Sequence, residues 1–415
     1  MKRFSAVLVT SVLLSTSQMS GSAFAQTSTV DPQRFSLIER GRYLATVGDC
    51  VSCHTAPGGL PFAGGLALNT PFGKLLSPNI TSDRATGIGA MTDAEFASSV
   101  REGRGRQGKR LYPAMPYPSY TLITDADVAA LRAYFATIPA VTNDVKVNQL
   151  SFPFSLRQDM MVWNVLEFTS GRYKPDSAKS AEWNRGAYLV NGLGHCNTCH
   201  TPKSILFGDK SNADYQGAAI EGWFAPNITN SKHLGLGDWS VQEVVDYLKK
   251  GTNGRALASA TMAQVVENST SKMTESDLKS IAVYLKSIEP KDERPVAALN
   301  ASGTEMKAGA AIYKDNCAAC HMDSGQGIGQ LFPKLAGSSN VRSADPTTSI
   351  RKIIEGSRAA ATDAAPTAPA MPSLAWRLND QQIADVLTYV RNSWGNAAPP
   401  VTASRVKVIR AESAN

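Results

Sequence analysis

The chain has 415 residues, 43% of them hydrophobic, and a formal net charge of +7. The hydrophobic content is ordinary for globular protein, and the part after residue 25 is longer than a single core usually holds, so two or three domains are expected. The charge is too small to indicate nucleic-acid binding, because Lys2 and Arg3 contribute two of the positive charges and lie in a segment expected to be removed.

The first 25 residues have the pattern of a secretory signal peptide. A basic start, an apolar run and an A-x-A cleavage site follow one another: Lys2 and Arg3, Ala6 to Leu14, and Ala23-Phe24-Ala25. We therefore predict that residues 1–25 are removed and that the protein is exported to the bacterial periplasm. No later run reaches about 18 consecutive apolar residues, so membrane contact is expected to be peripheral or through a partner.

One short string, C-x-x-C-H, occurs three times and contains all six cysteines and three of the five histidines. It is the attachment signal for c-type haem: two thiols one helical turn apart bond to the porphyrin, and the next residue delivers an imidazole to the iron. A single copy would leave a dithiol redox pair, half a zinc site or a disulfide open. Three copies at nearly even spacing, each closed by His, favour one haem per domain-sized block.

We therefore predict three covalent haem c groups. The predicted attachment residues are Cys50, Cys53, Cys196, Cys199, Cys317 and Cys320. The predicted proximal iron ligands are His54, His200 and His321.

Two helical patterns flank each string. A segment with Gly and Tyr precedes it, and a capped helix with one apolar face follows at the end of the block. The preceding pairs are Gly41 and Tyr43, Gly186 and Tyr188, and Gly309 and Tyr313. The terminal helices begin at Thr124, Thr274 and Asn379. A small residue in the first segment indicates a helix that crosses another closely.

The first two blocks share further elements between string and terminal helix. Pro-Asn-Ile-Thr occurs at 78–81 and 226–229, and capped helices begin at Thr92 and Ser240 and end at Gly103 and Gly251. The third block keeps only the helix that ends at Gly356.

The segment from Gly103 to Gly108 matches the dinucleotide-binding motif G-x-G-x-x-G. It follows a helix rather than a strand, so it predicts a helix stop and a basic loop. The basic residues there could neutralise haem propionates, meet a partner or face solvent: Arg101, Arg104, Arg106, Lys109 and Arg110.

These sequence features divide the chain into three domains, two linkers and a tail. The predicted domains are 34–140, 181–290 and 304–395. The linker 141–180 contains Phe152, Phe154, Trp163 and Phe168 and is too apolar for a free tether, so we expect it to pack across a domain interface, with docking to membrane or quinone as the alternative. The linker 291–303 is short and polar, and a solvated polar tail is expected over 396–415.

A helix before the haem string, an aromatic terminal helix and a ligand in the loop between them resemble the class I cytochrome c fold, so the predicted fold class is all-α with three tandem domains of this type. That fold usually places a Met sulfur opposite the His. Met115 and Met371 lie between prolines, which predicts a stiff extended strap, and Met262 lies at a similar distance before its helix. Met273 and His233 are rivals for the second block. Met322 follows a proximal His directly and cannot reach the other face.

The whole pattern resembles the trihaem cytochrome c subunit of periplasmic membrane-associated dehydrogenases. The resemblance rests on the sequence motifs Tyr112-Pro-Ala-Met-Pro-Tyr117, Pro-Asn-Ile-Thr twice, Asn184-Arg-Gly-Ala-Tyr-Leu-Val190 and Ser393-Trp-Gly-Asn396. The resemblance implies a large catalytic partner subunit of flavin, quinoprotein or molybdopterin type, electron delivery to ubiquinone, and room for a small third subunit. It also implies axial ligation by Met115, Met262 and Met371.

Fully ligated irons leave no open coordination position, so the sequence predicts an electron carrier that is not catalytic alone. Because the net charge is small, we expect no binding to nucleic acid. Two alternatives stay open. One is a haem enzyme with one open iron, for which the second block is the candidate. The other is a free-standing periplasmic electron shuttle.

Overall fold

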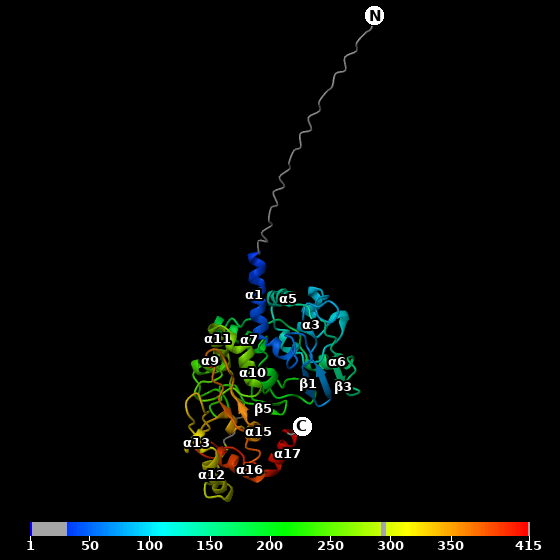
Figure 1. Ribbon diagram of the computed structural model, residues 1–415. Helices are drawn as coiled ribbons and strands as arrows, with labels where there is room; N and C mark the ends of the chain where they lie inside the picture. The colour runs from blue at the N-terminus through cyan, green and yellow to red at the C-terminus, as the bar shows by residue number, and fades with distance from the viewer. Residues whose placement is uncertain (2–30, 292–295, 414–415) are drawn as a thin grey trace.

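The computed structural model describes Met1 and residues 31–291 and 296–413. The predicted signal peptide lies outside the described residues. Three helical units follow one another down the molecule, from α1 and α5, through α7 and α11, to α12 and α16 (Figure 1). The prediction of a mainly helical chain is confirmed. Short antiparallel strands are added to it, which the sequence pattern did not predict.

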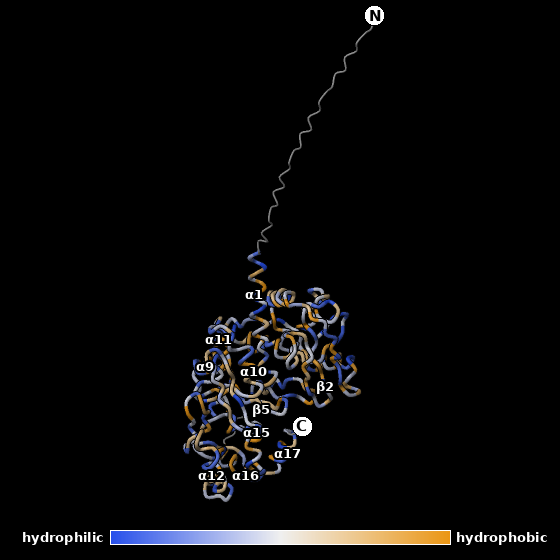
Figure 2. Tube along the Cα trace, in the orientation of Figure 1, coloured by the Kyte–Doolittle hydropathy of each residue, from blue (hydrophilic) through white to orange (hydrophobic). Residues whose placement is uncertain are grey.

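Each unit is built around two crossing helices. The pairs are α1 (Pro32–Val47) with α5 (Asp125–Phe135), α7 (Ala181–Asn191) with α11 (Glu275–Leu285), and α12 (Thr304–Asn316) with α16 (Asp380–Arg391). The first turns of α1 extend beyond the body of the molecule, and the trace there alternates between hydrophilic and hydrophobic residues (Figure 2).

A glycine lies where each pair crosses. A Cβ on Gly41 would lie 1.9 Å from the carbonyl oxygen of Ala130, and one on Gly186 would lie 1.9 Å from that of Ser280. At Gly309 the same distance, to Asp385, is 2.2 Å. The helices therefore pack backbone against backbone, as the small residue before each haem string indicated.

The terminal helices begin where the sequence predicts. The Thr124 and Thr274 side chains accept hydrogen bonds from the N–H groups of Asp127 and Asp277, and Asn379 forms a full capping box with Gln382. The third tyrosine is not equivalent to the other two, which lie two residues after their glycines. Tyr313 lies four residues after Gly309, and its hydroxyl donates to the carbonyl oxygen of Met322 at 2.6 Å.

Shorter elements complete the units. In the first they are α2 (Cys50–Cys53), β1 (Ala67–Thr70), β2 (Gly73–Leu76), α3 (Asp93–Glu102) and α4 (Tyr117–Tyr120). In the second they are α8 (Asn197–His200), β4 (Ala218–Ile220), β5 (Trp223–Ala225), α9 (Val241–Lys250) and α10 (Thr261–Asn268). In the third they are α13 (Ala318–His321), α14 (Ser339–Arg342), α15 (Thr347–Glu355), β6 (Ser357–Arg358) and β7 (Ala370–Met371).

The segment 141–180 contacts both neighbouring units. Its strand β3 (Asn148–Leu150) extends the β1–β2 hairpin through the register Gly73↔Leu150. Its helix α6 (Asp159–Glu167) reaches the second unit, where the Trp163 indole N–H donates to the carbonyl oxygen of Leu206 at 2.7 Å. The segment therefore packs across the interface between the first and second units, as its apolar composition indicates.

The prediction of a solvated tail over 396–415 is wrong for residues 396–413, the part of it that the structure describes. Residues Ala403–Ser413 form α17, which packs against α15 and α16 and fully buries Val406 and Ile409. Arg410 fixes the helix by donating to the Asp380 carboxylate at 2.7 Å. Only two apolar residues, three positions apart, mark this buried face, and charged residues surround them in the sequence.

The first and second units share one hydrophobic core. A single cluster of buried side chains joins Leu44 and Leu131 of the first unit to Leu189 and Leu278 of the second. The third unit has its own hydrophobic core, which includes Ile350, Ile383 and Val390. In the described part of the chain, no helix combines the length and apolar character needed to cross a bilayer.

Candidate haem centres

The three C-x-x-C-H strings each form one short turn of helix. This turn is α2, α8 or α13 together with the residue before or after it, and the three-residue spacing of the two cysteines places both thiols one turn apart on the same side. All six cysteines, which lie within the described residues, are free of disulfide bonds.

Burial raises the pKa of the Cys50 and Cys196 thiols to about 12 and that of Cys317 to about 11. These thiols are therefore protonated at neutral pH. A dithiol redox pair normally needs a lowered thiol pKa, so this environment disfavours that alternative.

Each string's histidine is oriented by a proline carbonyl. Nδ1 lies 2.8 Å from the Pro78 oxygen in His54, 2.7 Å from the Pro226 oxygen in His200, and 3.0 Å from the Pro333 oxygen in His321. Because a carbonyl can only accept, Nδ1 must carry the proton, and Nε2 is left with its lone pair.

Burial also lowers the pKa of all three imidazoles, which favours the neutral form that can bind a metal. An imidazole held through one nitrogen by a backbone carbonyl is the usual arrangement of a metal-ligating histidine. Two thiols one turn apart and such an imidazole fit the attachment of haem c at all three strings.

The sequence pattern marks two of the three prolines whose carbonyl oxygens accept from the histidines, and it does not mark the third. Asn79 and Asn227 fix the first two prolines' loops, because each amide oxygen accepts from the N–H of a threonine two residues later, at 2.9 and 2.8 Å. Pro333 is followed by Lys334 and Leu335 and has no such asparagine. The missing Asn-Ile-Thr signal is why sequence comparison did not pair Pro333 with the other two.

The three predicted Met ligands lie in different local structures. Met371 is in strand β7, as an extended strap requires. Met115 occupies a turn instead, in which its carbonyl oxygen accepts from the Tyr117 N–H at 2.7 Å, so the prediction of an extended strap is wrong there. Met262 lies in the first turn of α10.

All three Met side chains are partly buried. Met115 and Met262 pack against the core that Cys50 and Cys196 also contact, and Met371 packs against the same core as Cys317. The rival Met273 is fully buried in the shared core, with its carbonyl oxygen accepting from the Lys249 ammonium at 3.0 Å. His233 is half-buried in the loop between β5 and α9.

The first and second strings face each other. The residues just before them touch: the ring Nε2 of His195 lies 3.4 Å from the Gly48 carbonyl oxygen. Asn268 donates to the Ser52 hydroxyl at 2.8 Å, and the Ser269 hydroxyl donates to the Val47 carbonyl oxygen at 3.1 Å. His195 therefore belongs to the contact between the units.

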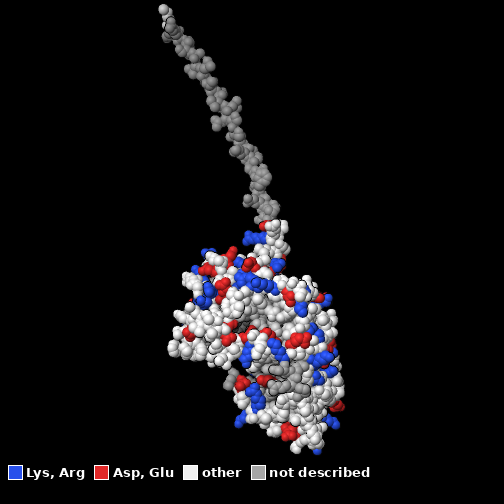
Figure 3. Space-filling model, turned by 180° about the vertical axis from the view of Figure 1, so that it is seen from behind, with Lys and Arg blue, Asp and Glu red and all other residues white. Residues whose placement is uncertain are grey.

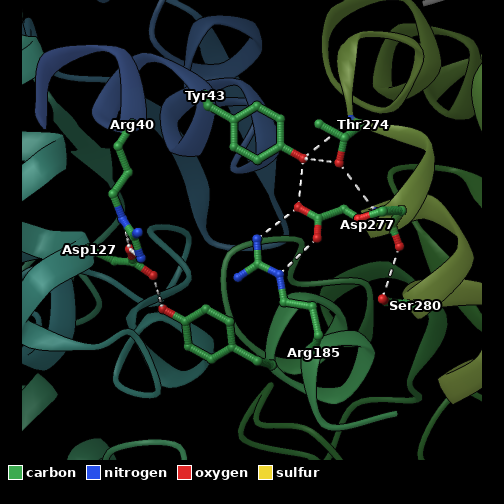
Figure 4. A network of polar contacts seen from close by, with 9 residues as sticks. Arg40, Tyr43, Asp127, Arg185, Thr274, Asp277 and Ser280 are labelled. Carbon is green, nitrogen blue, oxygen red and sulfur yellow. Dashed lines mark hydrogen bonds and ion pairs between the residues drawn. The ribbon is translucent and has the colours of Figure 1, made fainter. Parts of the chain in front are cut away.

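A reciprocal polar network joins the same two units (Figure 4). Tyr43 donates to Asp277 at 2.6 Å, and Arg185 pairs with that carboxylate at 2.7 Å. In the opposite direction, Tyr188 donates to Asp127 at 2.5 Å, and Arg40 pairs with Asp127 at 2.6 Å. Each unit therefore places a tyrosine on the aspartate in the first turn of the other unit's terminal helix.

The third unit docks beside the second string. The Thr348 hydroxyl donates to the Phe224 carbonyl oxygen at 2.9 Å, in the strand that leads directly to Pro226. On the other side, Ala360 donates its N–H to the Ala258 carbonyl oxygen at 3.0 Å, next to the α10 helix that carries Met262. The second centre therefore lies between the other two.

The basic residues at the end of α3 and in the loop after it separate into two groups. Arg101 is buried and pairs with Asp125 at 2.5 Å, and its Nε and Nη2 have no hydrogen-bond partner among the described residues. Arg104, Arg106 and Lys109 are exposed.

Comparison with known proteins gives matches over most of the chain. The Cytochrome c family model matches residues 38–139 and 306–394. The gluconate 2-dehydrogenase cytochrome c subunit of Pantoea cypripedii is 40% identical, over 92% of this chain and 91% of that protein. The cytochrome c subunit of alcohol dehydrogenase (quinone) from Gluconacetobacter polyoxogenes is 39% identical, over 95% and 88%. The fructose dehydrogenase cytochrome subunit of Gluconobacter japonicus is 37% identical, over 90% and 82%.

Proposed function

Because this chain belongs to the family of cytochrome c subunits of dehydrogenase complexes, we propose that it carries three haem c groups and passes electrons from a catalytic subunit to ubiquinone. The observation that carries the proposal is the threefold recurrence of one arrangement: two free thiols and a histidine whose Nδ1 contacts a proline carbonyl. A haem held there supplies an iron that gains and loses one electron at a time.

Two residues at each proposed haem favour electron transfer: a proline, through its carbonyl, and a methionine. The proline carbonyls of residues 78, 226 and 333 fix the imidazole rings and their tautomer. We assign Met115, Met262 and Met371 to the opposite iron position. A Met and His pair saturates the iron and raises its potential, which suits electron transfer rather than substrate binding.

The arrangement of the units supports a continuous route. The first and second strings face each other across a contact that the Tyr43–Asp277 and Tyr188–Asp127 hydrogen bonds hold in place. The third unit contacts the segments on either side of the second string. A fixed geometry keeps the separation of neighbouring haems constant, and each electron step depends on that separation.

The partners follow from the relatives and from the sequence. The relatives are cytochrome subunits named for gluconate, alcohol and fructose dehydrogenases, and one of these names specifies a quinone. We propose a large catalytic subunit as the electron donor and ubiquinone as the acceptor, with a small third subunit as a further component. The signal-peptide pattern of residues 1–25 supports a periplasmic position at the cytoplasmic membrane.

Haem counting and carbon monoxide binding test the proposal. The chain is produced in the periplasm of a host that attaches haem c, and haem is counted per chain by the pyridine haemochrome method. We expect three haems, and two in each variant that replaces both cysteines of one string with Ala. The fully reduced protein should bind no carbon monoxide. Stoichiometric binding at one haem would instead indicate an enzyme with an open iron. Purification of the protein from its own organism without a large subunit would indicate a free shuttle.

A further inference from the structure

The outward face of α6 is apolar. Met161, Val162, Val165 and Leu166 are exposed and recur at the spacing of one helix face. The charged residues of this helix, Asp159 and Glu167, lie at its two ends. A surface helix normally turns its apolar face inward, and α6 does the reverse.

Polar contacts hold α6 in this orientation. On its inner side Asn164 accepts from the Tyr117 hydroxyl at 2.6 Å, and Trp163 donates to the Leu206 carbonyl oxygen at 2.7 Å. The carboxylate of Glu167 accepts from the Ser204 hydroxyl at 2.9 Å. Because these contacts fix the inner face to both neighbouring units, the apolar outer face is a built feature of the fold.

Two further apolar side chains extend the same surface. Phe152 lies in the turn between β3 and α6, and Ile205 lies in the loop that α6 contacts through Leu206. Val165 is 84% exposed, Phe152 80% and Ile205 94%. We call these residues, with the four outer residues of α6, the α6 surface. Such side chains project from the molecule rather than line a pocket.

The α6 surface lies in a part of the molecule with few charges. The lobe at the left of Figure 3, which is the part that carries β3 and α6 at the right of Figure 1, is nearly free of charged side chains. A contiguous apolar area of this kind on a soluble protein marks an interaction site.

A basic loop borders this surface. Arg157, just before α6, donates to the Arg110 carbonyl oxygen at 2.6 Å and so ties the loop 103–110 to the start of the helix. Arg106 and Lys109 of this loop are exposed, and residues 103–110 contain no acidic residue, although the exposed Arg104 pairs with Glu102 at 4.0 Å. An apolar face with positive charge beside it is the pattern of a protein surface that lies on an anionic bilayer.

We propose that the α6 surface is the site at which the protein lies on an anionic lipid bilayer, with the apolar side chains in the acyl boundary and the basic loop at the headgroups. The inference rests on the proposed delivery of electrons to ubiquinone, which is dissolved in the bilayer. Projecting aliphatic and Phe side chains fit a fluid surface, whereas a protein partner's interface centres on side chains that fill pockets.

Vesicle flotation tests the inference on the full haem-containing chain. The vesicles contain phosphatidylcholine with about one third phosphatidylglycerol, a fraction chosen to give the surface negative charge. The test variant is Val165→Gln with Ile205→Gln. The matched control is Trp376→Gln, which removes a large apolar side chain that is 78% exposed on the third unit. Haem content and visible spectra verify folding of each protein.

The expected result is that the wild type and Trp376→Gln float with the vesicles, while the double variant binds at least ten-fold more weakly. Substituting the basic residues Arg106 and Lys109 with Gln should weaken binding to anionic vesicles and leave binding to pure phosphatidylcholine unchanged. Equal flotation of all variants would overturn the inference. So would loss of a co-purifying catalytic subunit in the double variant with lipid binding intact, because the surface would then belong to that subunit. Haem reduction by a dehydrogenase is measured separately, so failure of lipid binding does not imply failure of the electron-transfer proposal.

Discussion

Tyr43 in α1 donates a hydrogen bond of 2.6 Å to Asp277, which lies in the first turn of α11, the terminal helix of the next unit. Tyr188 and Asp127 repeat the contact in the opposite direction. Each aspartate also pairs with an arginine of its own unit, Arg40 with Asp127 and Arg185 with Asp277, and that arginine lies three residues before its own unit's tyrosine. The first two units are therefore related by an approximate two-fold exchange of the same side chains. In the third unit Ala308, Ala311 and Gln382 occupy the corresponding positions, so that unit cannot join by this contact.

The tyrosine hydroxyls of this contact are predicted to stabilise the pairing of units. Tyr43→Phe and Tyr188→Phe should each lower the free energy of unfolding by about 2 kcal/mol, because each removes a hydrogen bond to a charged acceptor. Urea denaturation followed by tryptophan fluorescence measures the change. Tyr173→Phe is the matched control: it removes a hydrogen bond to the neutral Asn184 side chain and should cost about 1 kcal/mol. Equal losses in all three variants would contradict the special role of the aspartate contacts.

Asp277 predicts an acid-sensitive contribution to stability. Burial alone would raise its pKa, but the hydrogen bonds from Arg185 and Tyr43 outweigh burial and hold the pKa below its usual value. A lowered folded-state pKa gives stability that is complete above the unfolded-state pKa of about 3.9 and is lost as the pH falls through the folded-state value. Asp277→Asn should therefore be less stable at neutral pH and lose less stability below about pH 4 than the wild type.

The control for this pH dependence is Asp246→Asn, which removes a surface pair with Lys250 at 3.1 Å. This half-exposed i,i+4 pair is expected to contribute under about 1 kcal/mol, so the variant should stay close to the wild-type curve. Parallel stability curves for the wild type and Asp277→Asn over pH 3 to 7 would show that Asp277 contributes no such term.

The glycines at the helix crossings are predicted to be indispensable. Gly186→Ala would place a Cβ 1.9 Å from the Ser280 carbonyl oxygen, which is backbone and cannot move without separating α7 from α11. We expect loss of the folded second unit and a large fall in haem content, because overpacking at a rigid contact is strongly destabilising. Gly171→Ala is the control, since a Cβ there meets nothing within 4 Å. Normal haem content in Gly186→Ala would contradict the close crossing.

Met262 is predicted to be the ligand of the second haem. Met262→Ala should open one iron, so that the reduced protein binds carbon monoxide at one haem per chain and one reduction potential falls. Met273→Leu, which keeps the volume of a fully buried core residue, should bind no carbon monoxide. Carbon monoxide difference spectra and a potentiometric titration report both effects. Binding in Met273→Leu and not in Met262→Ala would transfer the ligand role to Met273.

The sequence predicted the features that depend on local spacing. The capped terminal helices, the glycine crossings and the three histidine strings all have patterns within about fifteen residues, and the structure confirms the helices and the crossings. The haem attachment and ligand roles remain predictions. The extended strap at Met115 was wrong, because prolines restrict φ but allow a turn as well as a strand.

The features that were missed depend on distant contacts. Nothing near Tyr43 or Tyr188 in the sequence indicates that each reaches the other unit's aspartate. Pro333 lacks the neighbours that mark the other two prolines, and α17 buries only Val406 and Ile409 among many charges. In each case the side chain's role is set by a residue far away in the chain.

Electron transfer to quinone is the central claim, and anaerobic stopped-flow mixing of the reduced protein with a soluble ubiquinone analogue tests it most directly. Visible absorption follows the haems, and ultraviolet absorption follows the quinone. The account predicts that all three haems of each chain are oxidised and that one quinol forms for every two haems oxidised, because each haem gives one electron and the reduction of ubiquinone takes two electrons and two protons. A chain that stays reduced in the presence of quinone, with its haems fully attached, would contradict it.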